Sequence, residues 1–199
     1  GYFALVNNTT GAENVAVGSS ALASNTTASY NNAFGRYTLQ ANTTGANNTA
    51  IGHAALYANT TATDNTGLGF NALVANTTGS QNTAVGSYAL YDNTTGVYNT
   101  AVGESALAEV VDGERNTAVG RRALFKATHD QNTAVGYNSL YENTNGQYNT
   151  AVGSRALLNN TTADSNVAVG TDAMMNNTTG GRNIAIGKDC LYTDTTGNY

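Results

Sequence analysis

The sequence predicts an all-β fold, a β-solenoid made of one array of 17-residue coils that extends over residues 1–199. Three observations predict it: a 17-residue repeat, a glycine at one fixed place in every copy, and a composition dominated by Asn, Thr, Ala and Gly. A short period that persists through a whole chain is typical of stacked coils and not of a globular domain. Helices are excluded because Thr and Gly recur in every unit and no i, i+3, i+4, i+7 apolar stripe is present.

The averaged repeat reads N-T-A-V-G-x-x-A-L-x-x-N-T-T-G-x-x, with positions numbered from one at the first asparagine. Residues 1–13 form a partial copy, and eleven copies follow, the seventh of which is one residue short. Solenoids usually end in atypical capping repeats, which are absent at both ends, so we expect the chain to be a fragment of a longer fibre. The copies begin at Asn14, Asn31, Asn48, Asn65, Asn82, Asn99, Asn116, Asn132, Asn149, Asn166 and Asn183.

Two positions never vary between copies. The first is always Asn, which tolerates turn geometry and, when stacked in register, predicts a ladder of side-chain amides along the solenoid axis. The fifth is always Gly, which indicates a positive φ or the close approach of another backbone, so these residues are predicted to be structural turn glycines. They are Gly18, Gly35, Gly52, Gly69, Gly86, Gly103, Gly120, Gly136, Gly153, Gly170 and Gly187.

A small and a large apolar residue occur together twice in each copy, Ala-Val at positions three and four and Ala-Leu at positions eight and nine. Neighbours in a strand point to opposite faces, so we predict two short strands per coil, around positions 2–4 and 8–10, with the small residues on a second, tightly packed face. Two large apolar residues per coil make a thin core for the backbone they must order. We therefore expect an oligomer with either the small-residue face or the valine face buried between subunits.

Residues at equivalent positions of adjacent coils should stack about 4.8 Å apart. This register predicts ion pairs between Glu104 and Arg121 at position six and between Arg155 and Asp172 at position seven. It also predicts an aromatic column at position ten, made of Tyr57, Tyr91, Phe125, Tyr141 and Tyr192.

Composition limits the function classes. A net charge of -5 disfavours a phosphate-binding surface, so no nucleic-acid partner is expected. No apolar run approaches the ~18 residues needed to span a bilayer, so this segment is not expected to insert into a membrane. The single cysteine, Cys190, excludes an internal disulfide framework and is interpreted as a small buried residue in place of alanine at position eight.

The unit N-[TV]-A-[VI]-G-x-x-A-L resembles the N-S-V-A-I-G-x-x-S-x-A repeat of YadA-type trimeric autotransporter adhesin heads, and related arrays occur in trimeric, phage tail-fibre-like proteins. The resemblance covers essentially the whole chain. It implies a left-handed parallel β-roll assembled as a homotrimer, on a fibre that binds a host surface or matrix. The family's usual unit is nearer 14 residues, and no stalk, neck or anchor is present, so the bacterial and phage versions stay open.

One stretch, residues 104–130, departs from the repeat and holds much of the charge. It is a candidate surface binding patch midway along the rod, although a drifted repeat with a solvated charged face is the interpretation we favour. The candidate residues are Glu109, Asp112, Glu114, Arg115, Arg121, Arg122, Lys126 and His129.

Enzymatic and metal-binding functions find little support. His53 and His129 lie more than four coils apart, on the order of 20 Å, which is too far for a shared metal or a proton relay. Residues 67–72 mimic a G-x-G-x-x-A nucleotide turn, but no helix follows. We expect no catalytic residue, cofactor or metal. Calcium in particular is not expected, because the turns carry Asn and Thr in place of the Asp and paired Gly of calcium-binding repeats.

The function that we expect is that of a non-enzymatic extracellular or virion-surface fibre segment, an adhesin that attaches to a receptor, glycan or matrix protein of a host or cell by multivalent contacts. A purely structural spacer with the binding tip elsewhere is the alternative. An ice-binding solenoid is a third hypothesis, based on paired threonines such as Thr43-Thr44 and Thr60-Thr61, whose hydroxyls would stack in rows.

Overall fold

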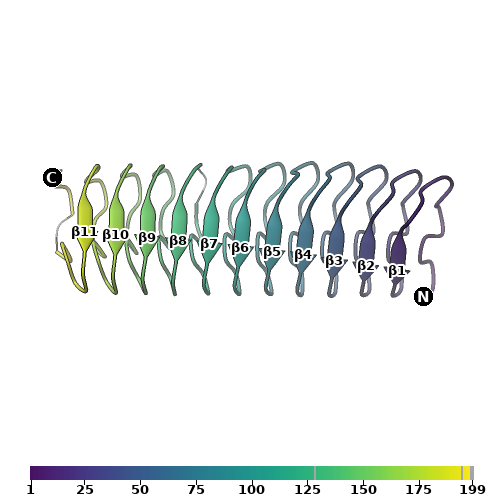
Figure 1. Ribbon diagram of the computed structural model, residues 1–199, viewed down its shortest axis with the longest axis horizontal. Helices are drawn as coiled ribbons and strands as arrows, with labels where there is room; N and C mark the ends of the chain where they lie inside the picture. The colour runs from purple at the N-terminus through teal and green to yellow at the C-terminus, as the bar shows by residue number, and fades with distance from the viewer. Residues whose placement is uncertain (128, 194, 198–199) are drawn as a thin grey trace.

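The computed structural model describes residues 1–127, 129–193 and 195–197, and this part of the chain forms strands and turns without any helix. Its coils stack into a rod with the two termini at opposite ends (Figure 1). Each full coil contributes one three-residue strand. The strands are β1 (Val15–Val17), β2 (Asn32–Phe34), β3 (Thr49–Ile51), β4 (Thr66–Leu68), β5 (Thr83–Val85), β6 (Thr100–Val102), β7 (Thr117–Val119), β8 (Thr133–Val135), β9 (Thr150–Val152), β10 (Val167–Val169) and β11 (Ile184–Ile186).

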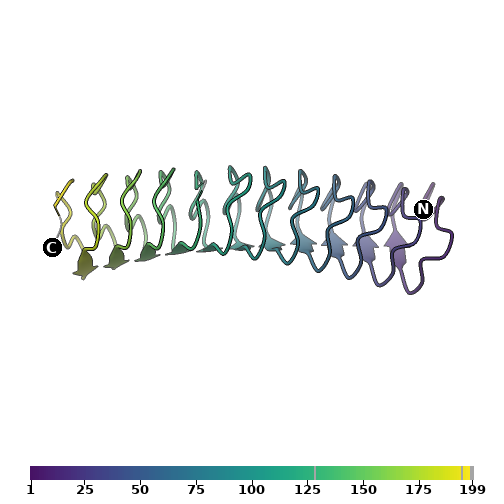
Figure 2. The ribbon, with the colours of Figure 1, turned by 90° about the horizontal axis from the view of Figure 1, so that it is seen from above.

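The eleven strands form one parallel sheet in chain order, along one side of the rod (Figure 2). Residues pair with the equivalent residue of the next coil, so Ala84 lies beside Ala101. At β7 and β8 the offset falls from 17 to 16 residues, and Thr117 pairs with Thr133. The missing residue is therefore absorbed in a turn, and the strand register is kept. The predicted β-solenoid of 17-residue coils is confirmed.

The predicted second strand at positions 8–10 was wrong: these residues lie in a turn in each coil. Positions seven and nine have positive φ, as Asn71 at 54° and Leu73 at 53° illustrate. Ala72 and Leu73 are both fully buried, whereas neighbours in a strand would point to opposite faces. A left-handed conformation at position nine thus turns both side chains into the interior. The Ala-Leu pair looks like half of an alternating strand, but here it is a turn with two inward residues.

A positive φ is unfavourable for a leucine, so this turn needs support from elsewhere. One contribution is a hydrogen bond from the backbone N–H of Leu73 to the carbonyl oxygen of Ala89 on the next coil, at 3.0 Å. The other is burial, since fully burying a leucine side chain contributes roughly 1.5–3 kcal/mol. Intercoil bonding and burial together hold a conformation that the local sequence does not favour.

The interior is filled by the small residues at positions three and eight and by the leucine at position nine. In the middle of the rod, Ala84, Ala89 and Leu90 are all fully buried. The valine at position four points outward instead, and Val119 is 37% exposed. The expectation that the small residues form a separate packing face was therefore wrong, whereas an outward valine face is the other of the two alternatives that the sequence left open. Within a three-residue strand only the middle side chain can point inward, and the coil is narrow enough that this residue must be alanine or glycine.

The glycines at position five meet both conditions that their invariance predicted. Gly86 has a φ of +136°, and a Cβ atom on it would lie 2.5 Å from the carbonyl oxygen of Gly103. This is the corner at which the chain leaves the sheet, and consecutive corners lie directly on top of one another. A side chain has neither the backbone conformation nor the space it needs there.

The asparagines at position one form a ladder through the interior, as predicted. Asn82 donates from Nδ2 to the carbonyl oxygen of Gly96 at 2.8 Å, and its Oδ1 accepts from the backbone N–H of Asn99 on the next coil at 2.9 Å. Asn82 is fully buried, and the same two contacts recur along the array. Each amide therefore supplies the acceptor for a backbone N–H that would otherwise be buried without a partner, and it also bonds a carbonyl of its own coil.

A second ladder, at position twelve, is less essential. Asn93 donates to the carbonyl oxygen of Gly96 at 3.2 Å and to Oδ1 of Asn76 at 2.8 Å. The carbonyl of Gly96 already has a donor from position one, so it does not depend on Asn93. This redundancy explains why position twelve is not always asparagine, as Val110, Ala127 and Asp194 show in the sequence, while position one is always asparagine.

Candidate functional site

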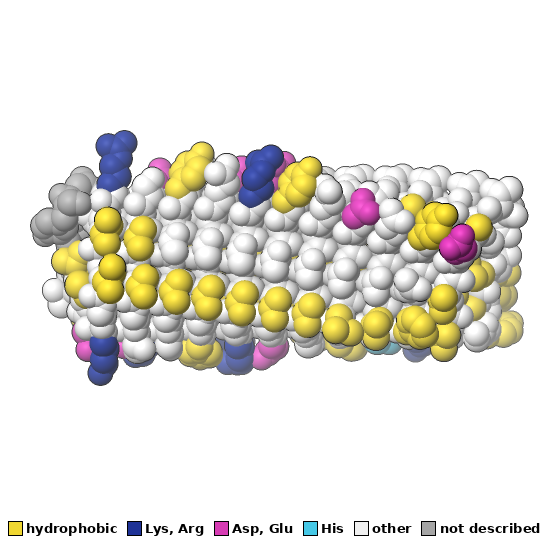
Figure 3. All heavy atoms as spheres, in the orientation of Figure 1, with side chains coloured by type: hydrophobic (Ala, Val, Ile, Leu, Met, Phe, Trp, Pro, Cys, Tyr) yellow, Lys and Arg dark blue, Asp and Glu magenta, His cyan; other side chains and the backbone are white. Residues whose placement is uncertain are grey.

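The outer face of the sheet carries two parallel rows of side chains, from positions two and four. Position two is Thr in most coils and is partly exposed, whereas position four is always apolar. We call the second row the apolar row, and it is visible as a yellow line along the rod in Figure 3. Exposed fractions within it reach 41% at Leu68 and 70% at Ile186. Its members are Val17, Phe34, Ile51, Leu68, Val85, Val102, Val119, Val135, Val152, Val169 and Ile186.

A continuous row whose members are all exposed or half-buried is informative, because isolated apolar residues are common on protein surfaces but long contiguous stretches are not. The apolar row is also flat, since it follows one parallel sheet in constant register. Flat apolar sheet faces are normally covered by a second layer of structure. Nothing in the described part of the chain covers this one.

The eight residues of the predicted patch are distributed over three parts of the coil. Repeat position decides where each one lies, because the register is unbroken through this stretch. Arg121 and Arg122 occupy positions six and seven, and Glu109 and Lys126 occupy position eleven. The remaining four residues occupy positions 14–17, and they are Asp112, Glu114, Arg115 and His129.

Both predicted ion pairs between stacked residues form. Arg121 bonds through Nε to Oε2 of Glu104, and Arg155 through Nη2 to Oδ2 of Asp172 at 2.6 Å. The hydrogen bond to Glu104 raises the pKa of Arg121 above its ordinary value. These pairs confirm the register. The pair between Glu104 and Arg121 is exposed and contributes little stability, whereas Asp172 of the second pair is buried.

A third ion pair between coils joins Lys126 to Glu142 at 2.8 Å. The comparison of repeat copies did not predict this pair. The hydrogen bond from Lys126 to Glu142 raises the pKa of the lysine. Arg115 is paired with its neighbour Glu114 at 3.1 Å. Several charges of the predicted patch are thus compensated locally.

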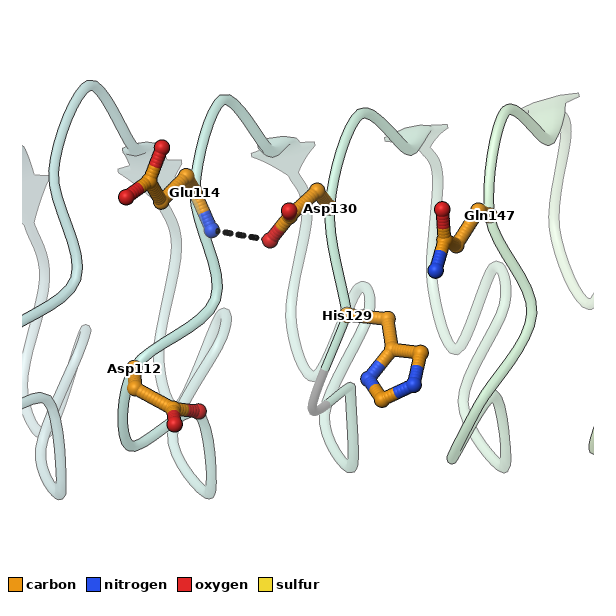
Figure 4. Close-up of a pocket in the computed structure, with 5 residues that line it drawn as sticks. All are labelled: Asp112, Glu114, His129, Asp130 and Gln147. Atoms are coloured by element: carbon orange, nitrogen blue, oxygen red, sulfur yellow. Dashed lines mark hydrogen bonds between the residues drawn. The ribbon is translucent and has the colours of Figure 1, made fainter.

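A shallow cleft of about 490 Å³ lies at the short coil and brings together part of the predicted patch (Figure 4). Asp112, Glu114 and His129 line it, together with Asp130 and Gln147. Oδ1 of Asp130 accepts a hydrogen bond from the backbone N–H of Glu114 at 2.8 Å, which closes the turn where one residue is missing. Figure 4 shows the carboxylate of Asp112 and the ring of His129 on separate turns, without a common point of convergence.

The charged and histidine side chains of this stretch lie on separate turns (Figure 4). Among the residues that the structure describes, no group of three or more His, Cys, Asp or Glu side chains is placed to hold a metal ion. The second histidine, His53, lies several coils away, with its ring stacked on Phe70 at a centroid distance of 5.3 Å. Cys190 is partly buried, and its thiol is free. The cleft is best described as an acidic surface depression.

The paired threonines of the N-T-T-G turn have different roles. The hydroxyl of Thr60 at position 13 donates to the carbonyl oxygen of Thr77 on the next coil at 3.2 Å, and Thr43 and Thr77 make the same bond. The second threonine of each pair, such as Thr61, is exposed. The position-13 hydroxyls are therefore engaged within the coil stack and do not form a free surface array.

A row of contacting aromatic rings, which we call the aromatic track, runs over the coils that begin at residues 31, 48, 65 and 82. Its residues occupy positions six, seven and ten, which follow the glycine corner where the chain leaves the sheet. Consecutive rings contact one another, with centroid distances of 5.9 Å between Tyr37 and His53 and 5.3 Å between Phe70 and Tyr88. The guanidinium of Arg36 lies 4.2 Å from the ring of Tyr37 at one end. The track consists of Tyr37, His53, Tyr57, Phe70, Tyr88 and Tyr91.

Comparing the repeat copies of the sequence with one another identified only part of the aromatic track. It found the position-ten aromatics, of which Phe125 and Tyr141 are in adjacent coils and stack at 5.1 Å as expected. It missed the contacts that position-ten rings make with rings at positions six and seven, such as Tyr88 with Tyr91 at 5.5 Å. Comparing copies one position at a time follows a single column, whereas these contacts run between columns.

The fold and its surfaces define a tandem-repeat β-solenoid with exposed apolar and aromatic rows. No protein-family model, curated protein or solved structure matches the chain. Within the described residues, no helix has the length and apolar character needed to cross a membrane.

Proposed function

We propose that this chain is a segment of a non-enzymatic extracellular fibre or adhesin, assembled as a homotrimer, which attaches to a host or cell surface through many weak contacts. The observation that carries the proposal is the apolar row, which runs along the whole outer face of the sheet. A row of this length calls for a partner that matches it over the full rod.

Another copy of the same chain meets that requirement. Every coil presents an outward apolar residue at position four, so two or three copies in register would place apolar rows opposite one another along their whole length. Sheets pack face to face about 10 Å apart, which leaves room for valine-sized side chains. The resemblance of the repeat to trimeric adhesin heads favours three chains, and the left-handed winding of the coil belongs to the same proposal.

Attachment by such a rod would depend on repetition. The remaining faces of the coil repeat along the axis and would be presented three times around a trimer. Several weak contacts made simultaneously gain avidity without any single deep pocket. The surface depressions of this chain are open and shallow, which suits that mode of binding.

A structural spacer is a second candidate function, and the uniformity of the coils favours it. The strand register is unbroken from β1 to β11, and even the short coil preserves it. A rod of this kind would hold a distant tip at a fixed reach whether or not its own sides bind anything.

The mass of the protein in solution tests the assembly. Sedimentation equilibrium should give three times the chain mass of 20.4 kDa. Val102→Lys places a charge in the middle of the apolar row and should dissociate the assembly, because three buried ammonium groups would face one another. Thr95→Lys adds the same charge at an exposed position outside the sheet and should leave the mass unchanged. A single-chain mass for the unsubstituted protein would overturn the proposal.

A coil deletion separates adhesion from spacing. Removing residues 149–182 deletes two whole copies and joins equivalent positions, so the register is kept. An adhesive rod should retain less binding to cells in proportion to the coils lost. A spacer should show unchanged binding when the tip domain of the fibre is present.

A further inference from the structure

The aromatic columns contain a gap that forms a cleft. At position ten, Ala108 lies between Tyr91 and Phe125 on the neighbouring coils, and it is 6% exposed. At position seven, Ser105 follows Tyr88. Small side chains in one coil between aromatic side chains in the coils on either side leave a cleft of about 220 Å³, which we call the position-ten cleft. It is smaller than a drug-sized pocket, which typically measures about 300–1,000 Å³.

The walls of this cleft are held in place by ring packing. On one side, the ring of Tyr91 packs edge-on against Tyr88 at 5.5 Å, and Tyr88 in turn packs against Phe70 at 5.3 Å. On the other side, Phe125 stacks on Tyr141 at 5.1 Å with the ring planes 6° apart. Binding in the cleft would therefore not require ordering of mobile aromatic side chains, which lowers its entropic cost.

The rim of the cleft carries unused polar groups. Asp92 and Glu109 occupy position eleven on adjacent coils, about 4.8 Å apart by strand spacing. Neither carboxylate makes a hydrogen bond or ion pair in the described part of the chain, and Glu109 interacts only electrostatically with Lys126 of the next coil. Two carboxylate acceptors thus lie beside the aromatic walls.

These groups together select a ligand chemistry. Flat aromatic walls favour a ring with an apolar face, and the carboxylates require hydrogen-bond donors around its edge. An anionic ligand is disfavoured by the two carboxylates, and a purely apolar ligand would bury them without partners. Stacked bases of a single-stranded nucleic acid would bring phosphates against a chain of net charge -5. A neutral sugar ring has apolar C–H faces and hydroxyls that both donate and accept.

We infer that the position-ten cleft binds one sugar ring of a neutral oligosaccharide that extends along the aromatic track. The inference rests on the proposed role in surface attachment, and it names the class of molecule to which the rod attaches. The track continues the Tyr88 wall over three further coils, as far as Tyr37, so additional sugar rings would meet further aromatic surface. The trimer proposed above buries the sheet face and leaves this track on a separate part of the coil.

Binding of defined oligosaccharides tests the inference. The probes are cellohexaose, maltohexaose, mannohexaose and chitohexaose immobilised on a surface, with polygalacturonate as an anionic comparison. At least one neutral probe should bind, and polygalacturonate should not. Ala108→Tyr fills the cleft with a side chain that position ten already carries in other coils, so it should fold normally and weaken binding about tenfold or more, the equivalent of one lost stacking contact.

Two further variants complete the design. Tyr91→Ala removes one wall and should weaken binding to a similar extent. Tyr148→Ala removes a tyrosine that is 53% exposed on a different part of the coil, and binding should be unchanged. Failure of every neutral probe to bind, or equal binding by Ala108→Tyr and the unsubstituted protein, overturns the inference.

The outcome for the sugar site is separable from the outcome for the fibre. The oligomeric mass and attachment to whole cells are measured on the same set of proteins. Trimers that attach to cells equally well with and without Ala108→Tyr would refute the sugar site and leave the proposed function intact. Monomers that bind a neutral probe through the cleft would refute the trimer and support the site.

Discussion

Replacing Asn82 with valine removes one rung of the position-one ladder and tests how the interior is held together. The substitution loses the bond from Nδ2 to the carbonyl of Gly96, worth about 0.5–1.5 kcal/mol, although that carbonyl keeps a second donor from Asn93. It also leaves the buried N–H of Asn99 without an acceptor, at a cost of about 1–3 kcal/mol. We expect the free energy of unfolding to fall by about 2–4 kcal/mol.

The matched variant is Asn93→Val, which makes the same chemical change at an equally buried position of the same coil. Its Oδ1 is already buried without a partner, because the next residue in its column is Val110. The substitution removes this unpaired oxygen but leaves Oδ1 of Asn76 without its donor, so the number of unpaired buried oxygens stays the same. We expect a loss of about 1 kcal/mol or less.

Urea unfolding followed by circular dichroism measures both variants, at equal protein concentration because assembly would change the apparent stability. Hydrogen exchange at the amide of Asn99 adds a local measurement, and exchange should accelerate in Asn82→Val but not in Asn93→Val. Equal destabilisation by the two substitutions would show that the ladders are equivalent and would refute this account of why position one never varies.

Three further outcomes follow from the fold. Gly86→Ala should lower the free energy of unfolding by about 2–6 kcal/mol, measured by thermal melting, because its φ of +136° and a backbone oxygen 2.5 Å from the new Cβ both oppose a side chain. In dissociated chains, Leu90→Ala should cost about 2–5 kcal/mol and Val85→Ala about 1 kcal/mol or less, a contrast that disappears if position four is the core. The pair between Lys126 and Glu142 should stabilise slightly below pH 10.5 and be lost as the pH rises through the raised lysine pKa, and Lys126→Met should abolish that pH dependence of the urea midpoint.

The repeat predicted the solenoid because its determinants are written at single positions. An invariant glycine such as Gly86 indicates a corner with positive φ, and an invariant asparagine such as Asn82 indicates a ladder between coils. Their 17-residue spacing sets the length of the coil. Stacking also followed directly, because residues at equivalent positions must lie beside one another once coils are stacked. The pair between Arg155 and Asp172 was predictable for that reason.

Which of the large apolar side chains face the interior could not be predicted from the repeat. The repeat shows that Val85 and Leu90 are both large and apolar, but not which of them points inward. Leu90 is buried because position nine adopts a positive φ of 51°, a conformation that no leucine favours by itself. The hydrogen bond from its N–H to Ala106 on the next coil supports that conformation, and this bond exists only after the coils have stacked.

The same limit applies to the candidate sites. The aromatic track and the position-ten cleft depend on contacts between columns, and the predicted charged patch is dispersed because neighbours in sequence lie on different sides of a coil. The sequence by itself therefore determined the period, the corners, the amide ladder and the identity of stacked neighbours, since each depends on one repeat position. The tertiary structure alone decided which apolar side chains face inward and which surface groups meet, because coil stacking sets the backbone conformation that orients them.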